Sequence, residues 1–477
     1  MLAQREISPV ELTRAHLARI EAVDPLLNSF ITVTEEVALR QAREAEREIA
    51  RGEYCGPLHG VPVAVKDLFE TLGVRTTAGS LHLAEYLPSE DAVAVQKFHG
   101  AGAVLLGKLN MHEWAMSVTN INPFYGDCRN PWDLDRIPGG SSGGSGAALA
   151  AELCLGALGS DTAGSIRIPA SLCGVVGLKP TYGRISTRGV LPLSWSLDHV
   201  GPMARQVRDV ALLLQALAGY DARDHYSVDV PVDDYLVGLE AGVQEWRVAL
   251  MCDGFSPTDK QVDTEVIQAV QEAARVFEQL GADVTEAVPS GIETLWRTYS
   301  RMLLSEALAY HQKRVEKEPE KFSDDTLASL KRAERYTAVD YAGARRAQVQ
   351  LRRQLEDYFG DFDILLTPAT PAPARLRSGQ ENHKGTRPSL VSYTAPFNVS
   401  GLPALSLPCG FTADNLPIGL QIVGPAWKEA QVLRAGYAYE QATTWHRRRP
   451  PPPVNRDTVA STAGRTRIGR KKGLDLP

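Results

Sequence analysis

The sequence predicts an α/β protein in which a β-sheet is covered by helices on both faces. Segments with helical periodicity alternate along the chain with short β-type runs, an order typical of such sheets. One run, VPVAV at 61–65, is apolar at every position, which is the pattern of a strand buried on both faces. Helices are expected at about 9–23, 35–51, 206–219, 261–279, 292–314, 336–358 and 428–443, and strands at 61–65, 103–107, 247–251, 363–367 and 404–408.

The first expected helix has a distinct start signal. Ser8 is suited to cap it, Pro9 takes its first position, and Glu11 completes a capping box. Further along, the glycine-rich stretch 138–151 ends in AALAA, which predicts a loop that runs into a helix N-terminus. The segment 221–247 is polar and rich in aspartate without a strong pattern, so we expect a long surface excursion there.

The end of the chain differs from the rest in composition. Residues 450–477 include consecutive prolines, several basic residues and few large apolar ones. Such a segment cannot bury enough apolar surface to offset its ordering entropy, so we expect a disordered tail. Composition favours a solvated tail over one that contacts nucleic acid or an acidic partner. Residues 1–449 are therefore expected to form the folded domain.

Charge and cysteine usage exclude several classes of function. The 477 residues carry 51 lysines and arginines against 57 aspartates and glutamates, a net charge of −6. This mild acidity gives no electrostatic footprint for nucleic acid or an anionic membrane, and no apolar run approaches the ~18 residues of a membrane span. The six cysteines are dispersed, which predicts reduced thiols rather than disulfides or a zinc site. No signal peptide is visible, so we expect a cytoplasmic protein.

Two glycine-rich stretches lie close together, PGGSSGGSGAALAA at 138–151 and GSDTAGSIRIP at 159–169. The first does not fit nucleotide binding, because it lacks the Lys-Ser/Thr ending of a phosphate loop and the acidic residue of a dinucleotide fold. Backbone N–H groups at the start of a helix favour negative charge, and an oxyanion suits them as well as a phosphate. We expect the second stretch to be a loop whose N–H groups surround a serine hydroxyl.

A lysine ends the apolar run at 61–65. Lys66 would be costly to bury without a partner. It is interpreted in two ways: its amine reaches water or pairs with Asp67, or it has a depressed pKa and can accept a proton. The residues alone leave both readings open.

Together these motifs resemble the amidase signature family, whose members hydrolyse carboxamides with a Ser–cis-Ser–Lys triad. The matching segments include GVPVAVKD, GKLNMHEWAM, NPWDLDRIPGGSSGGSGAALAA, GSDTAGSIRIPASLCGVVGLKPTYGR and SLDHVGPMAR, continued by LLTPATPAPA, FNVSGLPALSLPCG and LPIGLQIVGP. The resemblance spans about residues 8–446, is strongest over 60–205 and weakest over 225–355. It implies the amidase signature fold, with a large twisted mixed sheet, for residues 1–449.

The resemblance also implies roles for individual residues. Ser165 in TAGS matches the nucleophile, Ser141 in GGSSGG matches the serine after a cis peptide bond, and Lys66 matches the base. The family's oxyanion hole matches the backbone N–H groups of Thr162, Ala163, Gly164 and Ser165. Many relatives have Gly-Gly where this chain has Ala163-Gly164, which we interpret as tuning. The implied substrate contacts are Trp114, Ala115, Met116 and Gly140, and the first three favour an apolar or aromatic substrate although they would serve equally as core residues.

The chemistry of these residue types agrees with the resemblance. A serine hydroxyl needs an adjacent base, and a lysine with its usual pKa of ~10.4 is charged at pH 7. Desolvation favours the neutral amine, so Ser141 can relay a proton between Lys66 and Ser165. No metal spacing is present, so we expect no cofactor. Structural roles are expected for His112 and His199 and core positions for Cys154 and Cys173.

The first function considered is a free-standing amidohydrolase that attacks a carboxamide, with aryl amides, esters and carbamates also in range. A rival is the A subunit of a glutamyl-tRNA amidotransferase, which is similar over NPWDLDR and GLKPTYGRIS but not over 325–355. A non-catalytic binding module is disfavoured because all three triad positions are intact. We expect a small-molecule amide substrate, no nucleic-acid or membrane partner, and leave open whether the chain forms a homodimer.

Overall fold

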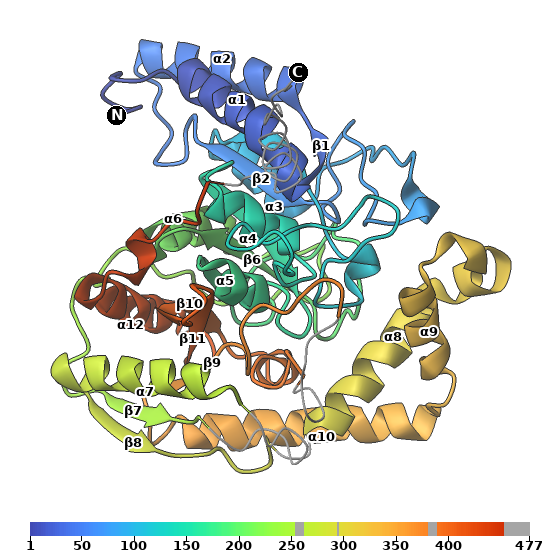
Figure 1. Ribbon diagram of the computed structural model, residues 1–477, viewed down its shortest axis with the longest axis vertical. Helices are drawn as coiled ribbons and strands as arrows, with labels where there is room; N and C mark the ends of the chain where they lie inside the picture. Colours follow the sequence, from blue (N-terminus) through green and yellow to red (C-terminus); the bar gives the residue numbers. More distant parts are fainter. Residues whose placement is uncertain (253–261, 293–294, 380–388, 453–477) are drawn as a thin grey trace, which may run out of the picture.

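The computed structural model describes residues 1–252, 262–292, 295–379 and 389–452. Within these ranges the helices and strands alternate as the sequence predicts (Figure 1). The strands are β1 (Phe30–Val33), β2 (Pro62–Lys66), β3 (Val104–Leu109), β4 (Gly156–Asp161), β5 (Val176–Lys179), β6 (His199–Ala204), β7 (Arg247–Leu250), β8 (Asp283–Glu286), β9 (Ile364–Pro368), β10 (Ala404–Phe411) and β11 (Pro417–Val423). The helices are α1 (Pro9–Leu27), α2 (Glu35–Arg51), α3 (Val93–Gly100), α4 (Gly143–Ala150), α5 (Arg167–Cys173), α6 (Val207–Leu217), α7 (Thr264–Gln279), α8 (Leu295–Lys317), α9 (Asp324–Ala333), α10 (Ala338–Tyr358), α11 (Ala395–Val399) and α12 (Glu429–Ala442).

All the described strands join in one mixed sheet. Its order is β1-β3-β2-β4-β6-β5-β10-β11-β9-β7-β8. Strands β2, β3 and β4 run parallel to one another, as do β7, β8 and β9, whereas β10 pairs antiparallel with both β5 and β11. Strands from both halves of the chain therefore meet at the centre of the sheet.

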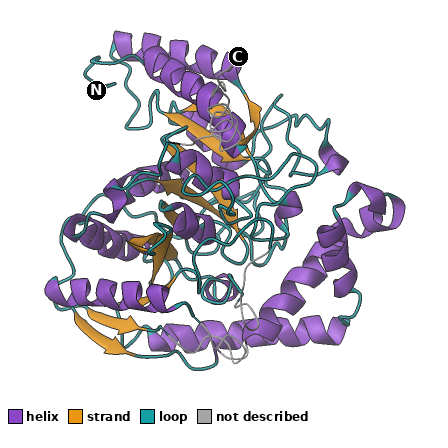
Figure 2. Ribbon diagram, in the orientation of Figure 1, coloured by secondary structure: helices purple, strands orange, loops and turns teal. Residues whose placement is uncertain are grey.

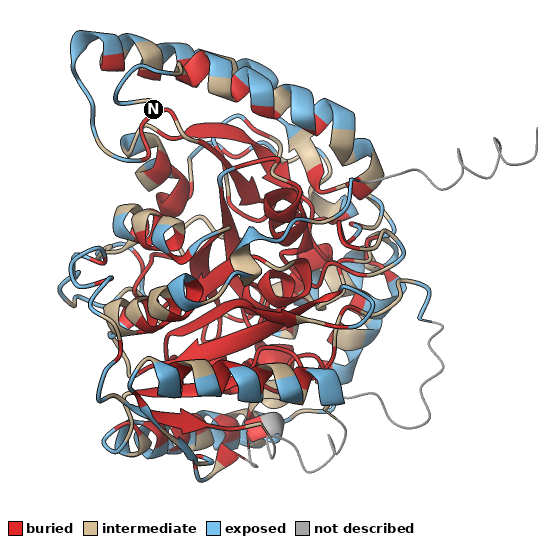
Figure 3. Ribbon diagram, turned by 60° about the vertical axis from the view of Figure 1, so that its left-hand side comes forward, coloured by how far each residue is buried: buried red, intermediate tan, exposed pale blue. Residues whose placement is uncertain are grey.

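Helices cover both faces of this sheet, which confirms the predicted fold class (Figure 2). Side chains alternate between the two faces along a strand. Val63 and Val65 belong to the apolar core shared with α3, α6, α7 and α12, whereas Ala64 between them belongs to the core shared with α1, α4 and α5. The strands are accordingly buried along most of their length, while the outer helix faces are exposed (Figure 3).

Local signals in the sequence account for several element boundaries. The predicted capping box of α1 is confirmed, because the Ser8 hydroxyl accepts from the Glu11 N–H and the Glu11 carboxylate accepts from the Ser8 N–H. The glycine-rich stretch 138–151 enters α4 as expected. The segment between α6 and β7 contains no described helix or strand, as expected for the excursion at 221–247.

One expectation is partly wrong. The stretch 159–169 is not a loop throughout, since its first three residues complete β4 and its last three lie in α5. Only residues 162–166 connect the two elements. Small residues such as Gly159 suit this central strand because an added Cβ would approach Ile166 and Ser142 at 2.9 and 3.0 Å.

Two further expectations concern the chain ends and membranes. The expected disordered tail at 450–477 lies outside the described residues from 453 onward, so it stays a prediction. Of the helices in the described part of the chain, none is long and apolar enough to span a bilayer.

Candidate active site

Lys66 lies at the end of β2 with its side chain fully buried. Its Nζ donates to the Ser141 hydroxyl at 2.7 Å and to the Ser160 hydroxyl at 2.9 Å. Both acceptors are neutral, and among the described residues no carboxylate is paired with this amine. The structure thus brings together Lys66 and Ser141, two of the residues singled out in the sequence.

Burial dominates the protonation equilibrium of this lysine. Desolvation lowers the pKa of Lys66 from about 10.5 to about 7, and the charges of Asp198 and Asp161 oppose this shift. A large fraction of Lys66 is then neutral near pH 7 and able to accept a proton.

The alternative interpretation of Lys66, a pair with Asp67, does not hold. Asp67 is fully buried and lies 3.2 Å from the Nζ of Lys108 on the neighbouring strand β3. Its other oxygen accepts from the backbone N–H of Thr77 at 2.9 Å. Asp67 therefore anchors Lys108 and the loop after β2, and it leaves Lys66 to the serines.

Ser141 lies just before α4, and the peptide bond between Gly140 and Ser141 is cis. The Ser141 carbonyl accepts from the backbone N–H of His112 at 3.2 Å. A Cβ on Gly140 would meet backbone atoms of 118–120 at 3.0–3.1 Å. This close approach explains a glycine at 140, because a side chain there would push the 118–120 segment away from Ser141.

Ser165 follows β4 in the short connection to α5. Gly164 before it has φ of +133°, a conformation that favours glycine, and an added Cβ would collide with the Thr394 hydroxyl. Ser165 is 3% exposed, and its carbonyl accepts from the Ser142 N–H at 3.3 Å. The connection carrying Ser165 is thus joined directly to the residue that follows Ser141.

The four candidate oxyanion donors are not equivalent. The Gly164 N–H donates to Asp161 Oδ1 at 2.7 Å, so this donor is engaged within the protein. The backbone N–H groups of Thr162, Ala163 and Ser165 have no such bond to Asp161 in the described residues. Thr162, Ala163 and Ser165 therefore remain the candidate oxyanion donors. Gly164 is a weaker candidate, because its N–H would first have to break its hydrogen bond to the Asp161 carboxylate.

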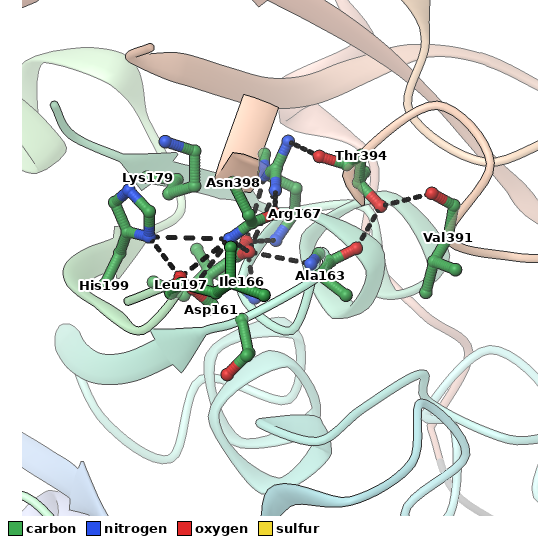
Figure 4. Close-up of polar contacts among 12 residues, drawn as sticks. Asp161, Ala163, Ile166, Arg167, Lys179, Leu197, His199, Val391, Thr394 and Asn398 are labelled. Carbon is green, nitrogen blue, oxygen red and sulfur yellow. Dashed lines mark hydrogen bonds and ion pairs between the residues drawn. The ribbon is translucent and has the colours of Figure 1, made fainter. Parts of the chain in front are cut away.

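Asp161 and Arg167, which flank the Ser165 connection in the sequence, form a fully buried ion pair (Figure 4). The guanidinium donates from Nε and Nη2 to the two carboxylate oxygens, both at 2.9 Å. Although burial alone would raise it, the pKa of Asp161 is held well below its usual range by Arg167. Such bidentate geometry fixes orientation as well as charge.

Residues from the C-terminal half complete this network. Arg167 also donates to the Asn398 side chain at 2.6 Å, to the Gln421 side chain at 2.7 Å and to the Thr394 carbonyl at 2.9 Å. The Thr394 hydroxyl in turn donates to the Ala163 carbonyl (Figure 4). Strand β11 and helix α11 thereby hold the backbone around Ser165.

A separate apolar cluster lies next to this connection. Its buried members are Ile137, Ala163, Ile168, Leu172, Ala374, Leu390, Val391 and Ala395, with Val118, Ile121 and Tyr299 packed against them. Ala163 is therefore the residue through which the serine connection contacts this cluster.

Comparisons with known proteins agree with this geometry. The sequence profile of the Amidase family matches residues 11–433. The chain belongs to the amidase signature family. The family and the fold expected from the sequence motifs are confirmed, and the chain is an enzyme with amidase-type C–N bond chemistry.

Individual relatives of this family member differ in their described activities. The A subunit of the glutamyl-tRNA(Gln) amidotransferase from Geobacter sp. (strain M21) is 42% identical over 94% of this chain and 97% of its own. A solved structure described as a vestigial protein complex that reveals the origins of an s-triazine catabolic enzyme is 37% identical, with TM-score 0.87 over 93% of this chain and 97% of that chain. A bacterial aryl acylamidase is 28% identical, with TM-score 0.85 over 93% and 95%.

In this family member the expected substrate contacts at 114–116 lie beside α8. The Trp114 ring packs edge-on against His311 at 4.4 Å, and the Arg314 guanidinium lies 5.0 Å from its centre. Trp114 and Ala115 are buried and Met116 is partly buried in the larger apolar core. Their contact with a substrate stays a prediction.

The histidines and cysteines singled out in the sequence contact protein groups. The His199 ring donates from Nδ1 to the Leu197 carbonyl at 2.7 Å, and burial lowers its pKa well below the usual range. Burial raises the pKa of Cys154 to about 12 and also raises that of Cys173, so neither thiol is a ready nucleophile. In the described part of the chain, no group of three or more His, Cys, Asp or Glu is placed to hold a metal ion.

Sequence reasoning missed four polar residues of this site, namely Ser160, Asp161, Asp198 and Asn398. Asp198 accepts from the Thr162 hydroxyl at 2.5 Å and from the backbone N–H groups of Leu193 and Ser194. The available signal was a polar residue at the end of an otherwise apolar strand, as at Ser160 and Asp161 of β4.

Proposed function

We propose that this chain cleaves the C–N bond of a carboxamide through an acyl-enzyme formed on Ser165. The observation that supports this most is the buried Lys66 amine, which donates to the Ser141 hydroxyl at 2.7 Å and has a pKa of about 7. In its neutral form Lys66 accepts the Ser141 proton while Ser141 takes the proton of Ser165. Ser165 Oγ then attacks the amide carbon.

The remaining steps use the same groups. Negative charge that develops on the carbonyl oxygen is stabilised by backbone N–H groups of Thr162, Ala163 and Ser165. When the C–N bond breaks, the departing nitrogen takes a proton that Lys66 returns through Ser141. Water then attacks the acyl ester, and the same relay restores the Ser165 hydroxyl. No step calls for a metal ion.

The apolar cluster beside Ala163 supports an apolar acyl group. Burying apolar surface stabilises binding by ~25 cal/mol per Å², and the cluster that includes Ala163, two residues before the nucleophile, is built of apolar side chains. An aryl or alkyl acyl group fits this environment. The 28% identical aryl acylamidase has the same fold.

A second candidate function rests on the relatives. Curated relatives about 40% identical over nearly the full chain are described as A subunits of glutamyl-tRNA(Gln) amidotransferases. These relatives favour an amidotransferase component, which would cleave glutamine within a complex, more than a free-standing hydrolase. Glutamine carries an ammonium and a carboxylate, which need polar partners that the apolar cluster does not supply.

One experiment tests the proposal and separates the two candidates. The purified chain alone is assayed for ammonia release from glutamine and from a series of apolar primary amides, with Ser165→Ala as the control. Turnover of apolar amides without a partner supports the free-standing hydrolase, whereas activity only with glutamine supports the amidotransferase component. Ser165 should react with a serine-directed phosphonate in either case, and EDTA should leave turnover intact. Labelling elsewhere would overturn the mechanism.

A further inference from the structure

One buried carboxylate of helix α8 binds the segment 193–198, which leads into β6. Glu306 is 1% exposed. Its Oε2 accepts from the Ser194 hydroxyl at 2.7 Å and from the Ser196 N–H at 3.1 Å. Its Oε1 accepts from the Ser196 hydroxyl at 2.6 Å and from the Tyr341 hydroxyl of α10 at 2.7 Å. Glu306 therefore ties this segment to both α8 and α10.

The same segment contacts the connection between β4 and α5. Asp198 Oδ1 accepts from the Thr162 hydroxyl at 2.5 Å. Asp198 Oδ2 accepts from the backbone N–H groups of Leu193 and Ser194 at 2.9 and 3.0 Å. Ser194 thus donates to Asp198 through its backbone and to Glu306 through its side chain. A continuous path of hydrogen bonds joins α8 to Thr162.

Thr162 takes part in this path and in the candidate oxyanion hole through different groups. Its hydroxyl is bound by Asp198, and its backbone N–H is one of the candidate oxyanion donors. Donors stabilise a developing negative charge most when they are held in place before the reaction. We propose that Glu306 is a positioning residue for oxyanion stabilisation. Through the segment 193–198 it fixes Thr162, and with it the direction of the Thr162 N–H. This proposal rests on the proposed amide cleavage at Ser165.

The peptide unit that carries this N–H is held from both sides. A peptide unit is planar, so the Asp161 carbonyl and the Thr162 N–H turn together. The Asn398 side chain donates to the Asp161 carbonyl at 2.8 Å, and Asp198 holds the Thr162 side chain. Without the second contact the peptide unit keeps only its carbonyl anchor, and the direction of the N–H is less well defined.

The donors around Glu306 show which substitutions interrupt the path. Leucine at 306 offers no acceptor, so the Ser196 N–H and the hydroxyls lose their partner and the segment is expected to shift. Glutamine keeps one acceptor oxygen for the Ser196 N–H. Its amide group can donate to the hydroxyl oxygens of Ser196 and Tyr341, which rotate to accept. Glu306→Leu therefore breaks the path, whereas Glu306→Gln preserves it.

The test is a double-mutant cycle on amide hydrolysis by the purified chain. Thr162→Val keeps the backbone N–H and removes the hydroxyl that Asp198 binds. Thr162→Val and Glu306→Leu should each lower kcat about 10-fold, with KM within about 2-fold, because they misdirect a donor whose complete removal costs ~10²–10³-fold. The double variant should lose no more than about 2-fold beyond either single variant, since both interrupt the same path.

Further readouts distinguish positioning from a general loss of structure. Rates are expressed per Ser165 labelled by a serine-directed phosphonate, so that unfolded molecules are not counted. Glu306→Gln should restore kcat to within about 3-fold of the wild-type value. A trifluoromethyl ketone, whose adduct with Ser165 carries an oxyanion, should lose affinity in proportion to kcat. Glu440→Gln is the matched control, because Glu440 is a buried glutamate of α12 that accepts from the Val207 N–H at 2.9 Å, and it should leave kcat unchanged.

The outcomes separate this proposal from the proposed function. If Glu306→Leu does not fold, Ser194→Ala replaces it in the cycle, because it removes one hydroxyl of the path and keeps the Ser194 N–H. Losses in kcat that multiply in the double variant, or a change in KM alone, would overturn the positioning role while amide cleavage stands. If the wild-type protein cleaves no amide and Ser165 is not labelled, both are overturned.

Discussion

Replacing Lys66 with methionine should remove the pH dependence that the buried amine gives to amide cleavage. With a pKa of about 7, Lys66 is about half neutral at pH 7 and about 1% neutral at pH 5, so kcat/KM of the wild-type protein should rise about 50-fold across that interval. A lysine with an ordinary pKa of ~10.4 would instead keep kcat/KM rising through pH 9, without the plateau expected above pH 7.

The loss of activity should depend on the leaving group. Lys66→Met removes the group that activates Ser165 and returns the proton to the amine, so amide cleavage should fall by more than ~10⁴-fold. An activated ester with the same acyl group expels a stable anion that needs no proton, so its loss should be smaller by about 10-fold or more.

The assay measures kcat/KM from pH 5 to 9 for a matched amide and activated ester. Lys179→Met is the control, because Lys179 is another fully buried lysine whose Nζ donates to the carbonyls of Pro180 and Leu402. That variant should keep the rising limb even if its thermal stability falls. Equal losses on amide and ester in Lys66→Met, or a limb that survives the substitution, would refute the proton relay.

Three further outcomes are expected. Asp198→Asn should move the rising limb to lower pH, because the Asp198 charge raises the pKa of Lys66; a shift to higher pH in the same assay would contradict this. Arg167→Met should lower the free energy of unfolding by about 3–5 kcal/mol by leaving the buried Asp161 charge unpaired, measured by denaturant titration, and a neutral effect would mean that water reaches the carboxylate. Deleting 453–477 should leave the melting temperature and turnover unchanged, because its composition offers few apolar contacts; a drop of several degrees would show that the segment docks.

The periodicity of apolar residues along the chain was sufficient to predict the long amphipathic helices. Helix α2 begins and ends where its pattern predicts, at Glu35 and Arg51, because alanines at every third or fourth position face the core. Strand β4 was missed by the same reasoning. Its sequence GALGSD has little intrinsic β-preference, and it is a strand because β2 and β6 pair with it on both sides.

Some residues of the site could be predicted from the sequence, and others could not. Lys66 was visible as a lone cation after an apolar run, and Ser165 as the hydroxyl that ends a glycine-rich segment. The partners that set their properties come from distant positions, such as Asp198 and Asn398, whose neighbours in the sequence give no chemical signal. Only the sheet order, which places β4 between β2 and β6, brings these residues to one place.

Helix α8 lies in the part of the chain where the family motifs are weakest. It carries Tyr299, which packs against the apolar cluster that includes Ala163, and Glu306, which accepts from the Ser194 and Ser196 hydroxyls. The catalytic groups lie instead on β2, β4 and the start of α4, and depend on neighbours in the sheet. A change in α8 can therefore alter the surroundings of the Ser165 connection without replacing Lys66 or Ser165, so relatives with the same triad are expected to differ in substrate through this helix.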